Sequence, residues 1–154
     1  GLIGAQAWVK AHKDKLPKIA NLFNRDGGPE PPVGISVPQA MYDDFVKISE
    51  PIQKIRPDYP FEVKVREPRK RPTRMGGTDA SVFAIEGVPT LGFTTEDFKG
   101  YDFDYGEIWH TERDLYTKNI PEYQEHTATV TAIIALGVAN LDKQLSREGL
   151  YTEE

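Results

Sequence analysis

Few side chains in this sequence have the chemistry that catalysis requires. The chain has three histidines and no cysteine, which excludes a disulfide framework, a thiolate metal site and a cysteine nucleophile. His110 stands out, because Asp114 follows it by four residues and a carboxylate in that place can orient a metal-bound imidazole. The spacing is compatible with a metal ligand, an acid–base group or a structural histidine. We expect His12, on the apolar stripe of a helix, and His126, near the surface, to be structural.

Two aspartates lie next to glycine pairs: Asp26 precedes one pair and Asp79 follows another. Asp26 comes at the end of an apolar run and before Gly27 and Gly28. A strand that delivers a carboxylate into such a turn is a common functional arrangement, although Asp before Gly is also ordinary turn chemistry. Asp79, or Thr78 before it, is expected to cap a short helix.

A long aromatic segment separates these aspartates from His110. Residues 94–109 form an expected loop, and loops of more than about 12 residues in compact domains are usually functional or disordered. The high aromatic content argues against disorder. Five aromatic side chains are therefore candidates for lining a binding pocket: Phe98, Tyr101, Phe103, Tyr105 and Trp109.

The elements that position these residues alternate along the chain. Helical spacing of apolar residues predicts helices at 2–16, 38–52 and 79–86 and a last helix of about 25 residues from Pro121. Pro51 is expected to kink or end the second helix. Short apolar runs predict strands at 19–24, 61–65 and 88–93, with the second near a sheet edge, and residues 30–34 are expected to be a Pro-rich loop. This order predicts an α/β fold with helices covering a small, largely parallel sheet.

Composition limits the remaining possibilities. A chain of 154 residues with 38% hydrophobic content is the size of one domain with a packed core. A net charge of −5 makes nucleic acid an improbable partner, and no run of about 18 apolar residues predicts a membrane span. The sequence starts at Gly1 without Met, in a helix that has no capping residue, so we expect a part of a longer protein.

Four stretches in series resemble metallopeptidase family 28, the di-zinc exopeptidases that include aminopeptidases and plasma glutamate carboxypeptidase. Residues 1–8 (GLIGAQAW) are similar to the stretch that follows the family's Glu-Glu pair. Residues 24–28 (NRDGG) are similar to its Asn-x-Asp strand end, and residues 77–83 (GTDASVF) with 86–89 (EGVP) to its Gly-Ser-Asp-His-x-x-Phe and Gly-Ile-Pro block. Residues 109–114 (WHTERD) match its Tyr-His-Thr-x-x-Asp element.

The resemblance implies a site that the chain holds only in part. It implies that Asp26 ligates one zinc ion and His110 the other, and that the remaining ligands and the general-base glutamate lie upstream of Gly1. It further implies that Asp114 supports His110, that Asp79 positions the loop near His110, and that the five aromatic residues line the substrate pocket. The chain departs from the family at Ala80, where many members have His, and at Arg25, where an apolar residue is usual.

These implications define the expected function. We expect the C-terminal part, residues 1–154, of a catalytic domain with a three-layer α/β/α zinc-exopeptidase fold, which needs its upstream part as a partner. The parent is expected to hydrolyse terminal peptide bonds with two zinc ions, most simply as an aminopeptidase, and the isolated chain to be inactive. The resemblance favours a secreted or periplasmic location. The alternatives are a glutaminyl cyclase-like acyltransferase and a non-catalytic peptide-binding or assembly domain.

Overall fold

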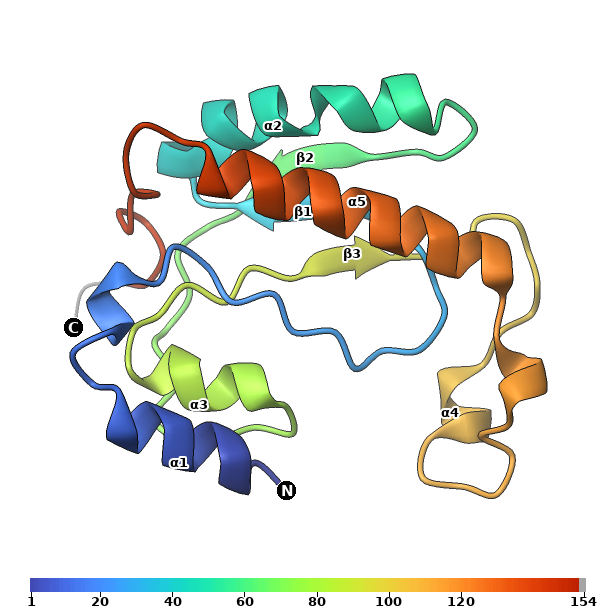
Figure 1. The fold of residues 1–154 in the computed structure, drawn as a ribbon, viewed down its shortest axis with the longest axis horizontal. Helices are drawn as coiled ribbons and strands as arrows, with labels where there is room; N and C mark the ends of the chain where they lie inside the picture. The colour runs from blue at the N-terminus through green and yellow to red at the C-terminus, as the bar shows by residue number, and fades with distance from the viewer. Residues whose placement is uncertain (153–154) are drawn as a thin grey trace.

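A three-stranded sheet lies at the centre of the computed structural model, which describes residues 1–152. The strands are β1 (Pro32–Val37), β2 (Glu62–Val65) and β3 (Phe93–Thr95), in the order β2-β1-β3 (Figure 1). Strand β2 pairs parallel to β1, whereas β3 pairs antiparallel to it. The largely parallel sheet that we expected thus holds for one of the two strand pairs, and the predicted edge position of residues 61–65 is confirmed.

Four of the α-helices form two packed pairs. Helices α2 (Tyr42–Ile55) and α5 (Pro121–Ala139) pack against each other and cover the sheet (Figure 1). Helices α1 (Ile3–Ala11) and α3 (Asp79–Ile85) pack together in a separate small core. The short helix α4 (Tyr105–Ile108) belongs to a lobe at the other end of the molecule (Figure 1). Residues 1–152 also contain three single-turn 3₁₀ helices: η1 (Leu16–Lys18), η2 (Gln39–Met41) and η3 (Tyr116–Lys118).

The main core lies between the sheet and the helix pair. Ile35 and Val37 of β1 are fully buried against Phe45 and Ile52 of α2 and the apolar face of α5. Burial of each such side chain stabilises the fold by about 1.5–3 kcal/mol. No helix of the described chain is long and apolar enough to cross a membrane.

Strand β1 corrects the prediction of a loop at residues 30–34. Pro32 is the first residue of the strand, where a missing N–H is tolerated. Gly34 is required by close packing, because a Cβ atom there would lie 2.4 Å from the carbonyl oxygen of Glu62 on the neighbouring strand. Proline and glycine, which usually indicate a loop, here begin the central strand.

The predicted strand at 19–24 is also wrong. This segment is extended, but one backbone bond, from Leu22 N to Pro89 O (2.9 Å), joins it to the neighbouring segment. The Asn21 side chain replaces further pairing, since its Nδ2 donates to Leu91 O (3.1 Å) and its Oδ1 accepts from Leu91 N (2.8 Å).

Four element boundaries differ from the predictions. Helix α1 ends at Ala11 rather than at residue 16. The strand expected at 88–93 is displaced to β3, which begins at Phe93. Helix α2 continues past Pro51 to Ile55, and α5 ends at Ala139 after 19 residues rather than about 25. His126 was expected near the surface but is fully buried, because α5 turns that position towards β1.

Candidate functional site

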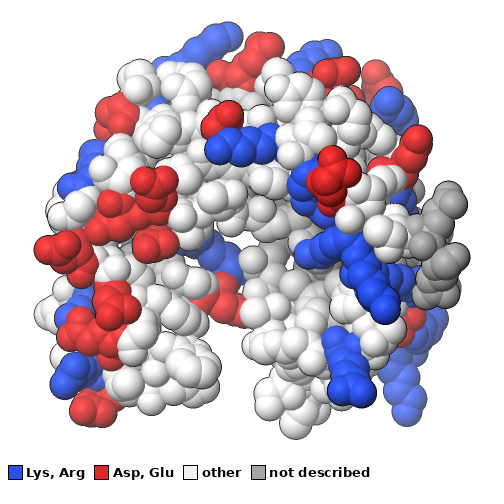
Figure 2. Space-filling view, turned by 180° about the vertical axis from the view of Figure 1, so that it is seen from behind, with Lys and Arg blue, Asp and Glu red and all other residues white. Residues whose placement is uncertain are grey.

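The candidate site is a cavity of about 730 Å³ between segments that are far apart in the sequence. The turn that carries Asp26 forms one wall, the segment after α4 forms the second, and the first half of α5 forms the third. From behind, the molecule is hollowed between two lobes, and acidic side chains gather on the lobe with α4, at the left of the view (Figure 2). The lining residues that bear polar or charged side chains are Arg25, Asp26, Asp114, Tyr116, Lys118, Asn119, Gln124 and Thr127.

Asp26 is held by its neighbours in the turn. Asn24 Nδ2 donates to Asp26 Oδ2 over 2.9 Å, and the carboxylate remains exposed. The Arg25 guanidinium donates to the carbonyl oxygens of Gly28 (2.8 Å) and Glu30, and its burial lowers the pKa of Arg25. Gly28 adopts φ +76° and packs against the Phe103 ring, where a Cβ atom would approach to 2.9 Å. The turn is thus braced while its carboxylate stays accessible.

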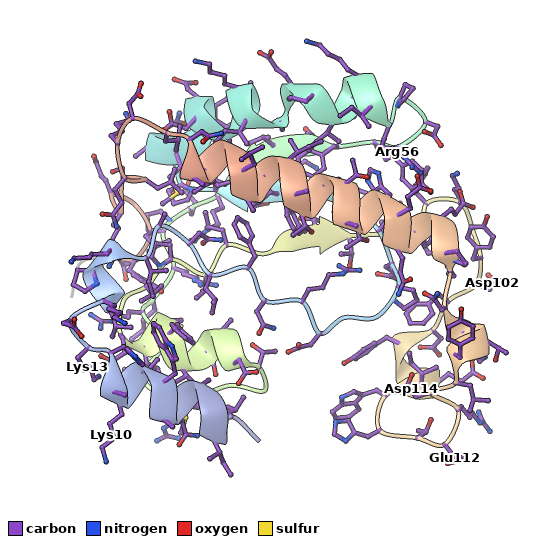
Figure 3. All side chains as sticks on the ribbon, in the orientation of Figure 1. Lys10, Lys13, Arg56, Asp102, Glu112 and Asp114 are labelled. Carbon is purple, nitrogen blue, oxygen red and sulfur yellow. The ribbon has the colours of Figure 1, made fainter. Side chains whose placement is uncertain are left out.

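His110 and Asp114 do not meet within one helical turn as the spacing suggested. His110 has φ +57°, which ends the helical path after α4, and its ring lies edge-on to Trp109 at 4.8 Å. Asp114 lines the cavity with Asp26, in the lobe that also carries Asp102 and Glu112 (Figure 3), whereas His110 is not among the lining residues.

The residues present do not form a complete zinc site. Carboxylate and imidazole are suitable zinc ligands, but a catalytic zinc ion usually has three protein ligands. Within residues 1–152, no group of three or more His, Asp or Glu side chains is placed to hold a metal ion. Asp26 and His110 therefore require ligands from outside the described chain if they bind zinc.

The five aromatic residues occupy three different environments. Phe98 is half-buried and packs edge-on against Tyr59, with ring centroids 5.0 Å apart. Tyr101 and Phe103 line a second cavity of about 510 Å³. Tyr105 is partly exposed beside Gly28, and Trp109 is 59% exposed next to His110. The structure does not gather them into one pocket.

Asp79 lies away from His110. It is in the first turn of α3, at the edge of an apolar groove lined mainly by Leu2, Trp8 and Phe83. Helices α3 and α4 lie at opposite ends of the molecule (Figure 1). Between the two residues the chain passes through β3, an edge strand of the sheet. The role expected for Asp79 in positioning the loop near His110 stays a prediction.

Two carboxylates anchor the aromatic segment to α5. Glu122 accepts hydrogen bonds from Lys99 Nζ (2.6 Å), Tyr59 OH (3.0 Å) and Tyr101 OH. These contacts, from Lys99 above all, lower the pKa of Glu122 to about 2. Lys99 in turn has a raised pKa, chiefly because of Glu122.

Asp97 makes the second anchor. Its Oδ1 accepts from Tyr123 OH (2.6 Å) and from Tyr101 N (3.0 Å). The bond from Tyr123 lowers the pKa of Asp97, while burial and the same bond raise the pKa of Tyr123 to about 12. Sequence reasoning missed these anchors, because the side chains that they join are 21 to 63 residues apart and no local pattern connects them.

Comparison with known proteins identifies the fold and the family. A crystal structure of a peptidase M28 precursor from Shewanella amazonensis SB2B is similar to the chain, with a TM-score of 0.67 and 23% sequence identity over 95% of this chain. The chain spans 30% of that protein's length. The likeness confirms the expected α/β fold, although no curated protein matches the sequence. The model of peptidase family M28 matches residues 1–134, and the chain therefore belongs to this family.

Proposed function

We propose that the chain is part of the catalytic domain of a zinc exopeptidase, most simply an aminopeptidase. Family M28 comprises zinc-dependent peptidases in general. In the proposal, Asp26 ligates one zinc ion and His110 the other, and the remaining ligands and the general-base glutamate come from a part of the domain that precedes Gly1. When bound, such a zinc pair supplies an activated water and polarises the scissile carbonyl.

The observation that carries the proposal is the placement of Asp26. Its carboxylate is exposed on the wall of the cavity of about 730 Å³ and is oriented by Asn24. Ile108, two residues before His110, lines the same cavity. An exposed carboxylate that is already oriented loses little conformational freedom when it binds a cation. The related protein is also much longer than this chain, which leaves room for the other ligands.

The proposal assigns supporting roles to nearby side chains. Asp114, on the same cavity, would accept a hydrogen bond from the His110 ring once a ligand fixes the loop. Tyr101 and Phe103, on the second cavity, would contact the substrate's terminal side chain, and Tyr105 and Trp109 would form its outer edge. Phe98 would act indirectly by packing behind them. Because the related protein is a precursor, we also propose that the parent is secreted or periplasmic.

The test uses the parent protein, which contains the proposed upstream part. It should release nitroaniline from aminoacyl-nitroanilides, and Asp26→Asn should abolish that release by removing a metal ligand. Asp14→Asn is the matched control and should leave the rate unchanged. Asp14 is exposed and follows Lys13, which lies at the opposite end of the molecule from Asp114 (Figure 3).

The alternatives give different outcomes. Turnover of N-terminal glutaminyl peptides without hydrolysis of aminoacyl-nitroanilides would indicate a glutaminyl cyclase-like acyltransferase. Unchanged hydrolysis in His110→Ala would refute the zinc assignment. A parent that binds peptides, contains no zinc and turns over neither substrate would be a non-catalytic domain.

A further inference from the structure

His126 is an ionisable side chain with no exposed surface. Its ring stacks on Tyr59, with centroids 3.9 Å apart and planes 15° apart. Its Nε2 atom lies 2.9 Å from the carbonyl oxygen of Pro32, the first residue of β1. A carbonyl oxygen only accepts hydrogen bonds, so Nε2 carries the proton and Nδ1 of the neutral ring holds a lone pair. His126 thereby joins α5 to β1 and to the turn that carries Tyr59.

The other ring nitrogen, Nδ1, would have no acceptor for a hydrogen bond if it were protonated. Nδ1 is buried and has no hydrogen-bond partner among the described residues. Protonation would create a buried donor without an acceptor, together with a buried positive charge, and both are costly.

Charges around the stack add to this cost. Lys99 Nζ lies 4.5 Å and Arg56 Cζ 4.8 Å from the centre of the Tyr59 ring. The closest acidic group in this turn, Asp58, has a side chain that is 57% exposed and already contacts Lys99 at 3.5 Å. Burial above all, reinforced by Arg56 and Lys99, lowers the pKa of His126, and this outweighs the opposing effects of the hydrogen bond to Pro32 and of Asp58. The titratable and charged groups that face the stack are Arg56, Asp58 and Tyr59 of the turn, Lys99 of the aromatic segment, and Glu122, Tyr123 and Glu125 of α5.

We propose that His126 is an acid-sensitive latch, whose protonation in mildly acidic solution releases the first half of α5 from β1 and from Tyr59. Release at this point reaches the second cavity, because Tyr59 also donates to Glu122, and Glu122 holds Lys99 and Tyr101 of the aromatic segment. The latch is independent of any metal, since it involves neither Asp26 nor His110.

The direction of the pH effect follows from linkage. The ordinary pKa of the histidine side chain is 6.5 and that of folded His126 is lower, so the unfolded chain binds more protons between the two values. The stability contribution is complete above pH 6.5 and is lost as the pH falls towards the folded value. One proton changes the folding equilibrium constant by at most about tenfold per pH unit.

Urea unfolding of the 154-residue chain between pH 7.5 and pH 4.5 tests the latch. Glu122, with its pKa of about 2, changes charge below this window. The wild-type folding constant should fall below pH 6.5 with a slope approaching one proton. His126→Phe, which keeps the stack, and His126→Gln, which keeps a donor for Pro32, should both lose that slope. His12→Gln and His110→Gln are the matched controls and should retain it. Equal slopes in wild type and both His126 variants would overturn the proposal.

A second measurement needs no variant. In ¹⁵N-resolved NMR spectra of the folded wild-type chain, His126 should be the Nε2–H tautomer and should titrate below pH 6.5. Amide exchange at residues 57–61 and 97–101 should rise together with that titration. An Nδ1–H tautomer, a titration at or above pH 6.5, or exchange that does not follow the titration would each contradict the latch.

Discussion

The hydroxyl group of Tyr123 offers a quantitative test of how the aromatic segment is anchored. The side chain is fully buried, donates to Asp97 Oδ1 at 2.6 Å and accepts from Lys99 N at 3.0 Å. Tyr123→Phe removes both bonds and leaves the Lys99 amide without this partner. A bond to a charged group contributes about 1.5–3 kcal/mol and a neutral one about 0.5–1.5 kcal/mol. Because Asp97 can be partly rehydrated, we expect a net loss of about 2 kcal/mol.

The assay is urea unfolding at pH 7, with Tyr101→Phe as the control. With a denaturant slope of about 2 kcal/mol/M, Tyr123→Phe should lower the unfolding midpoint by about 1 M without changing the slope. Tyr101 also loses a hydrogen bond to a carboxylate, that of Glu122, but its side chain is 51% exposed and water replaces the lost bond. Its midpoint should move far less. Equal shifts in the two variants, or no shift in Tyr123→Phe, would show that these bonds do not anchor the segment.

Three further predictions concern packing and charge. Gly137→Ala should destabilise the fold by up to about 2 kcal/mol, because the new Cβ atom would lie 2.3 Å from Ile48 Cγ2. This clash outweighs the better helix propensity of alanine. In a double-mutant cycle, Ile48→Ala should therefore cost less stability in the Gly137→Ala variant than in wild type. Glu122 has its pKa lowered from 4.5 to about 2, so its contribution to folding stability is complete above pH 4.5 and is lost as the pH falls towards 2. In acid unfolding, the stability of Glu122→Gln should therefore depend less on pH between 4.5 and 2 than that of wild type. Arg147 donates to four carbonyl oxygens, and Arg147→Gln should lower the thermal midpoint through a loss of about 2 kcal/mol.

The sequence pattern predicted those helices and strands whose residue spacing alone indicates their type. Helix α5 could be predicted because Pro121 starts a long run with helical spacing, and β2 because apolar and charged residues alternate there. Strand β1 could not be predicted, since Pro32 is tolerated because it is the first residue of the strand and Gly34 is required by the close approach of Glu62. Such contacts depend on which strand lies alongside.

In the candidate site too, some residues could be found from the sequence and others only from the folded structure. The resemblance identified Asp26 and Asp114, which the fold brings to one cavity from segments 88 residues apart. The fully buried position of His126 could not be predicted. Helical spacing indicates on which face of the helix a residue lies, but not which other element covers that face. The anchors at Asp97 and Glu122 were missed for a related reason: each depends on partners that only the folded chain brings together.

The zinc content of the 154-residue chain and of its parent tests the central claim most directly, that this chain carries one ligand for each of two zinc ions. By metal analysis after dialysis, the parent should retain two zinc ions per molecule, and Asp26→Asn and His110→Ala should each reduce that number, while Asp14→Asn should not. The isolated chain should retain none. Two tightly bound zinc ions in the isolated chain, or full zinc content in both ligand variants of the parent, would contradict the account.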